Sequence, residues 1–251
     1  MLQYRSTNVV WFLISFYHPL ILLLFWSIMY KEHGEVLTGW SLPSIASYYI
    51  FLIAASSLLV VHIEEDAYED IQRGDLSIYL MKPFSYFWIK FMSELPWRLL
   101  QGFYGFVAIV LLITIFGIIL NMSLSLSSIL LFVVIAILGY FVSFMFKMLL
   151  LLAAFWMTDT SALRNLVEII LLIGMGFVVP IQFLPDTIRQ IAITLPFAYM
   201  VYYPVIVLTS RLSSAEYLRI ISMQLLWIGS FALIYRWMWV NGIKKFSAVG
   251  R

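Results

Sequence analysis

The stretch SILLFVVIAILGYFVSFMFKMLLLLAAFWM, residues 128–157, carries a single charge, that of Lys147. Crossing the hydrocarbon core of a bilayer takes about 20 consecutive apolar residues in a helix. The rest of the chain is similar: 63% of its 251 residues are hydrophobic, 11% are charged, and the mean hydropathy is +0.99. These values lie far from those of soluble globular domains. We therefore expect an all-α integral membrane protein.

Outward from this stretch, the same length criterion identifies five more apolar segments. The six predicted transmembrane helices cover residues 9–30, 45–63, 99–120, 128–157, 164–180 and 214–240, in a single transmembrane domain over residues 1–251. Arg5 precedes the first segment without a small-residue cleavage site. We therefore interpret that segment as a retained span and not as a removed signal peptide.

Lysine and arginine residues are divided unevenly between the two sides of these spans. With the N-terminus inside, ten lie on the inner side: Arg5, Arg73, Lys82, Lys90, Arg98, Arg164, Arg236, Lys244, Lys245 and Arg251. Four lie on the outer side: Lys31, Arg189, Arg211 and Arg219. Basic residues are retained on the cytoplasmic side of membranes. The sequence thus predicts that both termini and residues 64–98 are cytoplasmic, and that 31–44 and 181–213 are outside.

The outer segment 181–213 is unusually apolar and is divided by prolines. Pro180, Pro185, Pro196 and Pro204 separate pieces that are too short to cross a bilayer, and Asp186 can cap a short helix. Apolar pieces of this length fit a re-entrant hairpin packed against protein, although an ordinary apolar loop is the alternative. Ser213 and Glu216 have the spacing of a capping box at the start of the last span.

The inner segment 64–98 combines charges with glycine and proline. Its acidic residues are predicted to continue the second span as a polar helix that Gly74 breaks. If Gly74 takes a left-handed backbone, which only glycine adopts freely, it should tolerate substitution poorly. Asp75 can then cap a short helix on which Leu76, Tyr79, Leu80 and Pro83 share one side, and Ser85 can start another, amphipathic helix. This pattern indicates either a helix that docks a cytosolic protein or one that only lies on the membrane.

The same segment carries a resemblance to a known family. DIQRGDLSIYLMKPFSYF, residues 70–87, resembles the cytoplasmic motif I-x-x-G-x-L-x-x-Y-L-x-[KR]-P of type-2 ATP-binding-cassette (ABC) exporter permeases. The residues in register are Ile71, Gly74, Leu76, Tyr79, Leu80, Lys82 and Pro83. Similarity continues in VVPIQFLPDTIRQI (178–191), LPFAYMVYYPVIVL (195–208) and KKFSAVG (244–250).

This resemblance implies a transport function and a set of site residues. It implies a multi-pass permease of the cell membrane that pairs with a second copy of itself or a related permease, driven by separate cytosolic ABC ATPase subunits. The implied coupling residues are Asp70, Ile71, Arg73, Gly74, Asp75, Leu76, Tyr79, Leu80, Lys82 and Pro83. The implied outer-gate residues are Pro180, Phe183, Pro185, Pro196, Phe197 and Pro204. The chain has no G-x-x-x-x-G-K-[ST] phosphate loop, so ATP and Mg are expected on the partner and no cofactor on this chain.

Two charges inside predicted spans stand out: Lys147 in the fourth and Glu168 in the fifth. Arg219 and Arg236 lie near the ends of the last span, where a long side chain reaches the interface. Intramembrane charges are candidates for function. Three interpretations remain open: Lys147 reaches the interface with its long side chain, the two residues form a structural pair, or they contact a substrate.

Other functions have little support in the sequence. No nucleophile or metal-ligand pattern is present, because the chain has no cysteine and His18, His33 and His62 lie in separate segments. A net charge of +2 does not indicate nucleic-acid binding. A secondary carrier or channel and a membrane-embedded enzyme are the alternatives, and both lack their expected polar residues.

Overall fold

The computed structural model describes residues 21–22, 24–32, 40–116, 126–210 and 212–246, and within these ranges the chain contains no strand. The longer helices are α2 (Leu42–Leu59), α5 (Tyr86–Phe116), α6 (Leu126–Leu152), α7 (Ser161–Gly174) and α10 (Ser214–Gly242). The shorter helices are α3 (Glu64–Gln72), α4 (Leu76–Leu80), α8 (Asp186–Thr194) and α9 (Tyr202–Thr209). Three 3-10 turns are η3 (Ala153–Phe155), η4 (Ile181–Phe183) and η5 (Pro196–Tyr199). The all-α prediction is confirmed for this part of the chain.

Three of the described helices are long and apolar enough to cross a membrane: Leu42–Leu59, Ser128–Phe155 and Ser214–Gly242. They lie at the second, fourth and sixth predicted spans, and α5 and α7 lie at the third and fifth. With 14 residues, α7 is about 21 Å long, which is shorter than a hydrocarbon core of about 30 Å. The first predicted span, residues 9–30, lies mostly outside the described residues.

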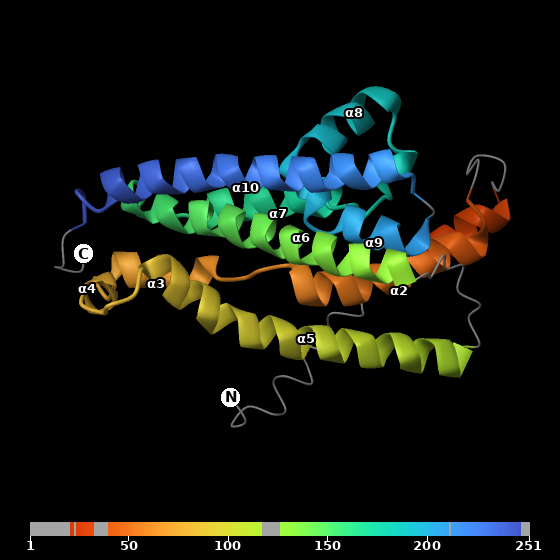
Figure 1. Ribbon diagram of the computed structural model, residues 1–251, viewed down its shortest axis with the longest axis horizontal. Coiled ribbons are helices and arrows are strands. Elements are labelled where there is room, and N and C mark those ends of the chain that lie inside the picture. The colour runs from red at the N-terminus through yellow and green to blue at the C-terminus, as the bar shows by residue number, and fades with distance from the viewer. Residues whose placement is uncertain (1–20, 23, 33–39, 117–125, 211, 247–251) are drawn as a thin grey trace.

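The longer helices run side by side along the long axis of the molecule (Figure 1). α10 packs against α6, α2 packs against α5 and α9, and α9 also contacts α6. The short helices α3 and α4 lie at one end of the bundle, close to the C-terminal end of α10, whereas α8 and α9 lie toward the other end (Figure 1). The two unusual segments of the sequence therefore belong to opposite ends of the molecule.

The second span does not continue into a polar helix, so that prediction was wrong. Residues 60–63 are not helical, and Val60 has extended backbone angles of φ −82° and ψ 117°. Two N–H groups of this linker donate to other helices instead: Val61 N–H to Ser143 Oγ and His62 N–H to Glu94 Oε1, each at 3.4 Å. Because α5 and α6 supply these acceptors, the chain can leave the helix without losing all of its hydrogen bonds.

The helix expected after Ser85 begins at Tyr86 but continues without a break to Phe116. Pro96 lies inside it, where proline lacks the N–H that would bond to the carbonyl four residues earlier. The boundary that we placed between residues 98 and 99 is therefore not a helix boundary. One rigid element joins the segment near α4 to the third predicted span.

The residues that follow the C-terminal end of α7 are held by side chains of α2. Gly176 has a φ of +78°, and a Cβ atom there would collide with the hydroxyl of Tyr48. The Tyr48 hydroxyl donates to the Gly176 carbonyl at 2.8 Å, and the Tyr49 hydroxyl donates to the Val178 carbonyl at 3.1 Å. Carbonyls freed at a helix end need such partners where water is scarce. This is how α7 can end short of the expected span.

Candidate functional site

Gly74 separates α3 from α4 as expected. Its φ of +83° is left-handed, which is the condition under which we expect it to tolerate substitution poorly. Asp75 occupies the N-cap position of α4, but its side chain makes no capping hydrogen bond. Its φ of −65° and ψ of −17° are helical, and a capping side chain needs an extended backbone at that residue. The predicted Asp75 cap was therefore wrong.

The apolar residues predicted to share one side of this helix differ in burial. Leu76 is fully buried in the core of the protein, Tyr79 is half-buried, and Leu80 and Pro83 are exposed. The exposed apolar surface, which we call the α4 patch, instead consists of Ile78, Leu80, Met81 and Phe84. Met81 is 80% exposed and Leu80 is 43% exposed. The face that remains available to a partner is thus shifted from the one that the sequence predicted.

A small cavity lies beside the α4 patch. It has a volume of about 340 Å³. Its lining residues come from the α4 region, the start of α5 and α10: Tyr79, Leu80, Phe84, Ser85, Tyr86, Phe87, Tyr235 and Trp239. An apolar hollow next to exposed apolar side chains is a suitable receptor for a side chain of another protein.

An ion pair, a hydrogen bond and a ring contact attach the α3–α4 region to α5, and a further ring contact joins this part of α5 to α10. Asp70 Oδ2 lies 2.5 Å from Lys90 Nζ and accepts a hydrogen bond from the Tyr86 hydroxyl at 2.8 Å. The ring of Tyr86 packs against Tyr79, with centroids 5.4 Å apart, and stacks on Trp239 at 5.6 Å. Asp70 and Lys90 are both buried. A buried, hydrogen-bonded pair of this kind fixes the position of α3 relative to α5.

Further contacts join α3 to the end of α6. The Gln72 side-chain amide donates to the carbonyl of Ala154 at 2.8 Å and to that of Met157 at 3.0 Å. Ile71 is buried beside them. By contrast, Arg73 makes only an exposed ion pair with Glu69 at 3.0 Å, and Lys82 Nζ lies 4.7 Å from the ring centroid of Tyr79. The proposed coupling residues thus include both firmly anchored and exposed side chains.

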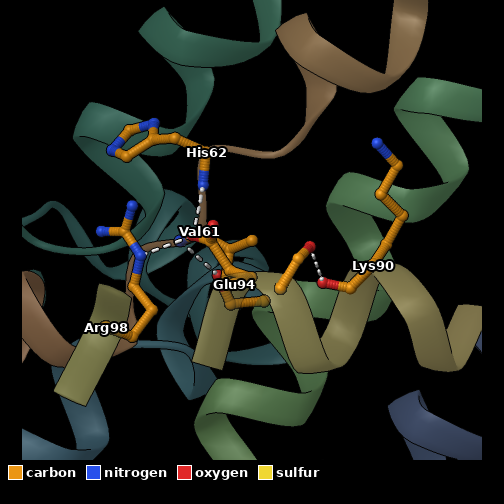
Figure 2. Close-up of polar contacts among 7 residues, drawn as sticks. Val61, His62, Lys90, Glu94 and Arg98 are labelled. Atoms are coloured by element: carbon orange, nitrogen blue, oxygen red, sulfur yellow. Dashed lines mark hydrogen bonds and ion pairs between the residues drawn. The ribbon is translucent and has the colours of Figure 1, made fainter. Parts of the chain in front are cut away.

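Three charged residues of α5 lie one helical turn apart and are all buried: Lys90, Glu94 and Arg98. Glu94 Oε1 accepts from Arg98 Nε at 2.5 Å and from the His62 N–H. Figure 2 shows the ammonium of Lys90 directed away from Glu94, whereas the terminal nitrogens of Arg98 lie on the same side as the His62 ring. The middle residue, Glu94, therefore links α5 to the non-helical residues 60–63.

A larger cavity of about 820 Å³ opens next to this row of charges. Its walls come from the end of α2, the linker 60–63, α5 and the second half of α7. The polar lining residues are Ser56, Ser57, His62, Lys90, Ser93, Glu94, Arg98, Gln101 and Glu168. The other lining residues are Val60, Ile63, Trp97, Leu171, Leu172, Met175 and Phe177. We call it the α5–α7 cavity.

Lys147 and Glu168 lie together, with Lys147 Nζ 2.5 Å from Glu168 Oε1. The Lys147 side chain is 2% exposed, so it does not extend to a surface as the first of the three interpretations required. The Glu168 side chain is 45% exposed and lines the α5–α7 cavity. The structure therefore supports a pair in which only the carboxylate reaches the cavity.

The predicted outer-gate residues do not form a single cluster. Pro180, Pro196 and Pro204 are buried, whereas Pro185 is exposed at the start of α8. Phe183 packs against Trp26 and Trp40, and Phe197 packs against Phe146 of α6. Asp186 is the first residue of α8 and pairs with Arg189; the N-cap position predicted for it belongs to Pro185.

Around these residues, α9 and η5 are mostly buried. Tyr199, Met200, Val201 and Val205 are fully buried or nearly so. The capping box of Ser213 and Glu216 at the start of α10 is confirmed. Within residues 181–210, η5 and α9 thus pack against the bundle, whereas α8 is mostly exposed and contacts η4 and η5.

Sequence reasoning did not identify Glu94, Arg98 or Ser143 as site residues. Lys90, Glu94 and Arg98 carry a readable signal, because charges at every fourth position lie on one face of a helix. We had assigned Lys90 and Arg98 only to the count of cytoplasmic basic residues. Ser143 carries no such signal, since a serine in an apolar helix usually bonds to its own backbone.

The chain was compared with protein families, with curated proteins and with solved structures. Residues 16–250 match the family described as ABC-2 family transporter protein. Neither the curated proteins nor the solved structures include a match. Because the match covers nearly the whole chain, this membrane protein belongs to the ABC-2 family of transporters and is an ABC transporter permease.

Proposed function

We propose that this chain is the permease subunit of an ATP-driven exporter, docked through the α4 patch to a separate cytosolic ABC ATPase. The observation that carries the proposal is an exposed apolar patch on a segment that is otherwise anchored to α5 and η3. Soluble surfaces rarely expose such a cluster without a binding partner. The family match supports a transport subunit that works with an ABC ATPase.

In this proposal, the anchors of α3 transmit movement of the ATPase into the membrane. A push on α4 reaches α5 through the Asp70–Lys90 pair and α6 through Gln72. α5 carries the movement further because it is one continuous helix. Packed elements tend to shift between discrete arrangements instead of deforming gradually.

The remaining parts of the exporter are assigned in the same proposal. Six spans cross the cell membrane with both termini in the cytosol, and a second permease, identical or related, completes the path. The segment 181–213 forms a re-entrant hairpin at the outer gate, in keeping with its burial against α2 and α6. ATP and Mg bind to the partner ATPase, and this chain needs no cofactor of its own.

The test is a charge placed in the α4 patch. Leu80→Asp and Met81→Asp would each bring an unpaired carboxylate into a desolvated contact, which weakens docking by about 2–5 kcal/mol. Leu80→Met is the matched control, because it keeps an apolar side chain of similar volume at the same position. Membrane expression, ATPase pull-down and export are measured on all three variants.

Normal expression of the aspartate variants with loss of pull-down and export, and normal behaviour of Leu80→Met, is the expected result. Leu76 is not a useful position for this test, because it is fully buried and a charge there would disturb folding. If both aspartate variants still bind the ATPase and export, the α4 patch is not the docking surface.

A further inference from the structure

We propose that the α5–α7 cavity binds an amphipathic anion, with the carboxylate or phosphate group at Arg98 and the apolar chain against α7. The starting observation is the state of Arg98. Its side chain is only 7% exposed, and its Nε is held by Glu94 at 2.5 Å. Among the described residues, Arg98 makes no other hydrogen bond or ion pair.

The terminal N–H groups of Arg98 therefore have no hydrogen-bond acceptor among the described residues. Figure 2 shows them pointing away from Glu94, and Arg98 is part of the cavity wall. A guanidinium presents its N–H groups as a planar fork that matches the two oxygens of a carboxylate or phosphate. Arg98 lines the cavity, so an anionic group bound there could accept hydrogen bonds from its terminal N–H groups.

The other charges of the cavity are already neutralised by close partners. Lys90 pairs with Asp70, and Glu168 pairs with the buried Lys147, each at 2.5 Å. Glu94 is engaged by Arg98 and by the His62 N–H. The unused donors of Arg98 thus determine the sign of the ligand, and the neighbouring side chains of His62 and Gln101 offer further polar contacts.

Beyond Glu168, the α7 side of the cavity fits an apolar chain. Its lining residues there are all apolar: Leu171 and Leu172 of α7, its C-cap residue Met175, and Phe177. The volume of about 820 Å³ lies within the range of about 300–1,000 Å³ that is typical of small-molecule sites. A cavity with one polar and one apolar wall favours a molecule that has both parts.

If the chain is an exporter, the α5–α7 cavity is where cargo enters the permease, next to the linker 60–63 that Glu94 holds. This role rests on the proposed export function, whereas binding of an amphipathic anion at Arg98 does not. An anionic membrane lipid has the same chemistry as an amphipathic anionic cargo. Both would use Arg98, so the experiment has to separate them.

The experiment measures binding to the purified full-length permease, without any ATPase, by native mass spectrometry from a maltoside detergent. Dodecyl phosphate is the probe, and inorganic phosphate and dodecyltrimethylammonium are its controls. We expect one dodecyl phosphate per chain to bind saturably, with both controls at least about tenfold weaker. Competition by phosphatidylglycerol, but not by phosphatidylcholine, would assign the site to a bilayer lipid; no competition would assign it to a single-chain cargo.

Three variants locate the site. Arg98→Gln should weaken dodecyl phosphate binding about tenfold or more, since it removes the charged fork. The double variant, Glu94→Gln with Arg98→Gln, should have the same effect without leaving a buried carboxylate unpaired. Leu172→Trp should obstruct the apolar wall of the cavity while it keeps the Glu94–Arg98 pair. Arg189→Gln is the matched control, because Arg189 forms a similar intrahelical pair with Asp186 on α8.

Unchanged binding in both the double variant and Leu172→Trp would overturn the inference, as would equal binding of dodecyltrimethylammonium. These results are independent of docking at α4. Loss of ATPase docking alone would refute the proposed function and leave the anion site standing.

Discussion

The exposure of Lys147 and Glu168 differs greatly, and this determines which of the two charges can be removed. The ammonium is almost fully buried, whereas the carboxylate is half-exposed in the α5–α7 cavity. Glu168 could therefore be solvated in the cavity if its partner were lost. Lys147 could not be solvated in the same way, because its side chain is almost fully buried, and losing an ion-pair partner there is strongly unfavourable.

We predict that Glu168→Gln destabilises the protein by about 3 kcal/mol and that Lys147→Met has a clearly smaller effect. The double variant, Lys147→Met with Glu168→Gln, should recover most of the loss, because it leaves no buried charge. Thermal unfolding of the four purified proteins measures the coupling. Additive effects of the two single substitutions would show that the pair does not stabilise the fold.

Gly74 provides a second prediction for a single residue. An alanine at φ +83° costs about 1–2 kcal/mol, because its Cβ crowds the following carbonyl. Gly74→Ala should therefore destabilise the α3–α4 turn and reduce ATPase pull-down. Gly229→Ala is the control, since Gly229 lies in α10 with no atom within 4 Å of the added Cβ. The control should be neutral or slightly stabilising in thermal unfolding, and equal losses in the two variants would contradict this account.

At the level of elements, the sequence predicted what depends on local signals. The helix break at Gly74 and the Ser213–Glu216 capping box follow from residue type and spacing, and both were confirmed. The break at residues 60–63 could not be predicted, because LVVHI is compatible with a helix and its new partners lie on α5 and α6. The Asp75 cap failed because its backbone is helical where a capping residue is extended.

The early end of α7 depends on the tyrosines of α2, which leads to a testable expectation. Tyr48→Phe leaves the Gly176 carbonyl buried without its donor, at a cost of about 1–3 kcal/mol. Tyr217→Phe is the control, because the Tyr217 hydroxyl makes no hydrogen bond within the described part of the chain and the residue is half-buried on α10. Thermal unfolding should show a lower melting temperature for Tyr48→Phe only. A similar loss in both variants would mean that removing any tyrosine hydroxyl is harmful.

At the scale of the whole molecule, the candidate site required three-dimensional information that no local pattern contains. Lys147 and Glu168 stood out because charges are rare in apolar spans, and their pairing was one of three open interpretations. The α5–α7 cavity did not stand out, because its walls come from segments more than 100 residues apart in the chain, such as His62 and Glu168. The sequence placed the exposed apolar surface on the right segment and included Leu80, but it also included Leu76, whose burial depends on packing against the bundle.

The orientation of the bundle in the membrane is the last prediction. The end with α3 and α4 should face the cytosol and the start of α10 should face outside, because ten basic residues lie on the first side and four on the second. The chain has no cysteine, so single cysteines report on their sites alone. Ser85 and Ser214 are suitable positions: both are exposed, and neither is the capping Ser213, whose loss would weaken α10.

An impermeant maleimide added to intact cells should label Ser214→Cys and not Ser85→Cys. Permeabilised cells should show labelling of both, and the unaltered chain should show none. Labelling of Ser85→Cys in intact cells would place the α4 patch outside, where no cytosolic ATPase could reach it. In that case the topology and the docking proposal would fail together, whereas the anion site at Arg98 would remain to be judged by its own binding measurements.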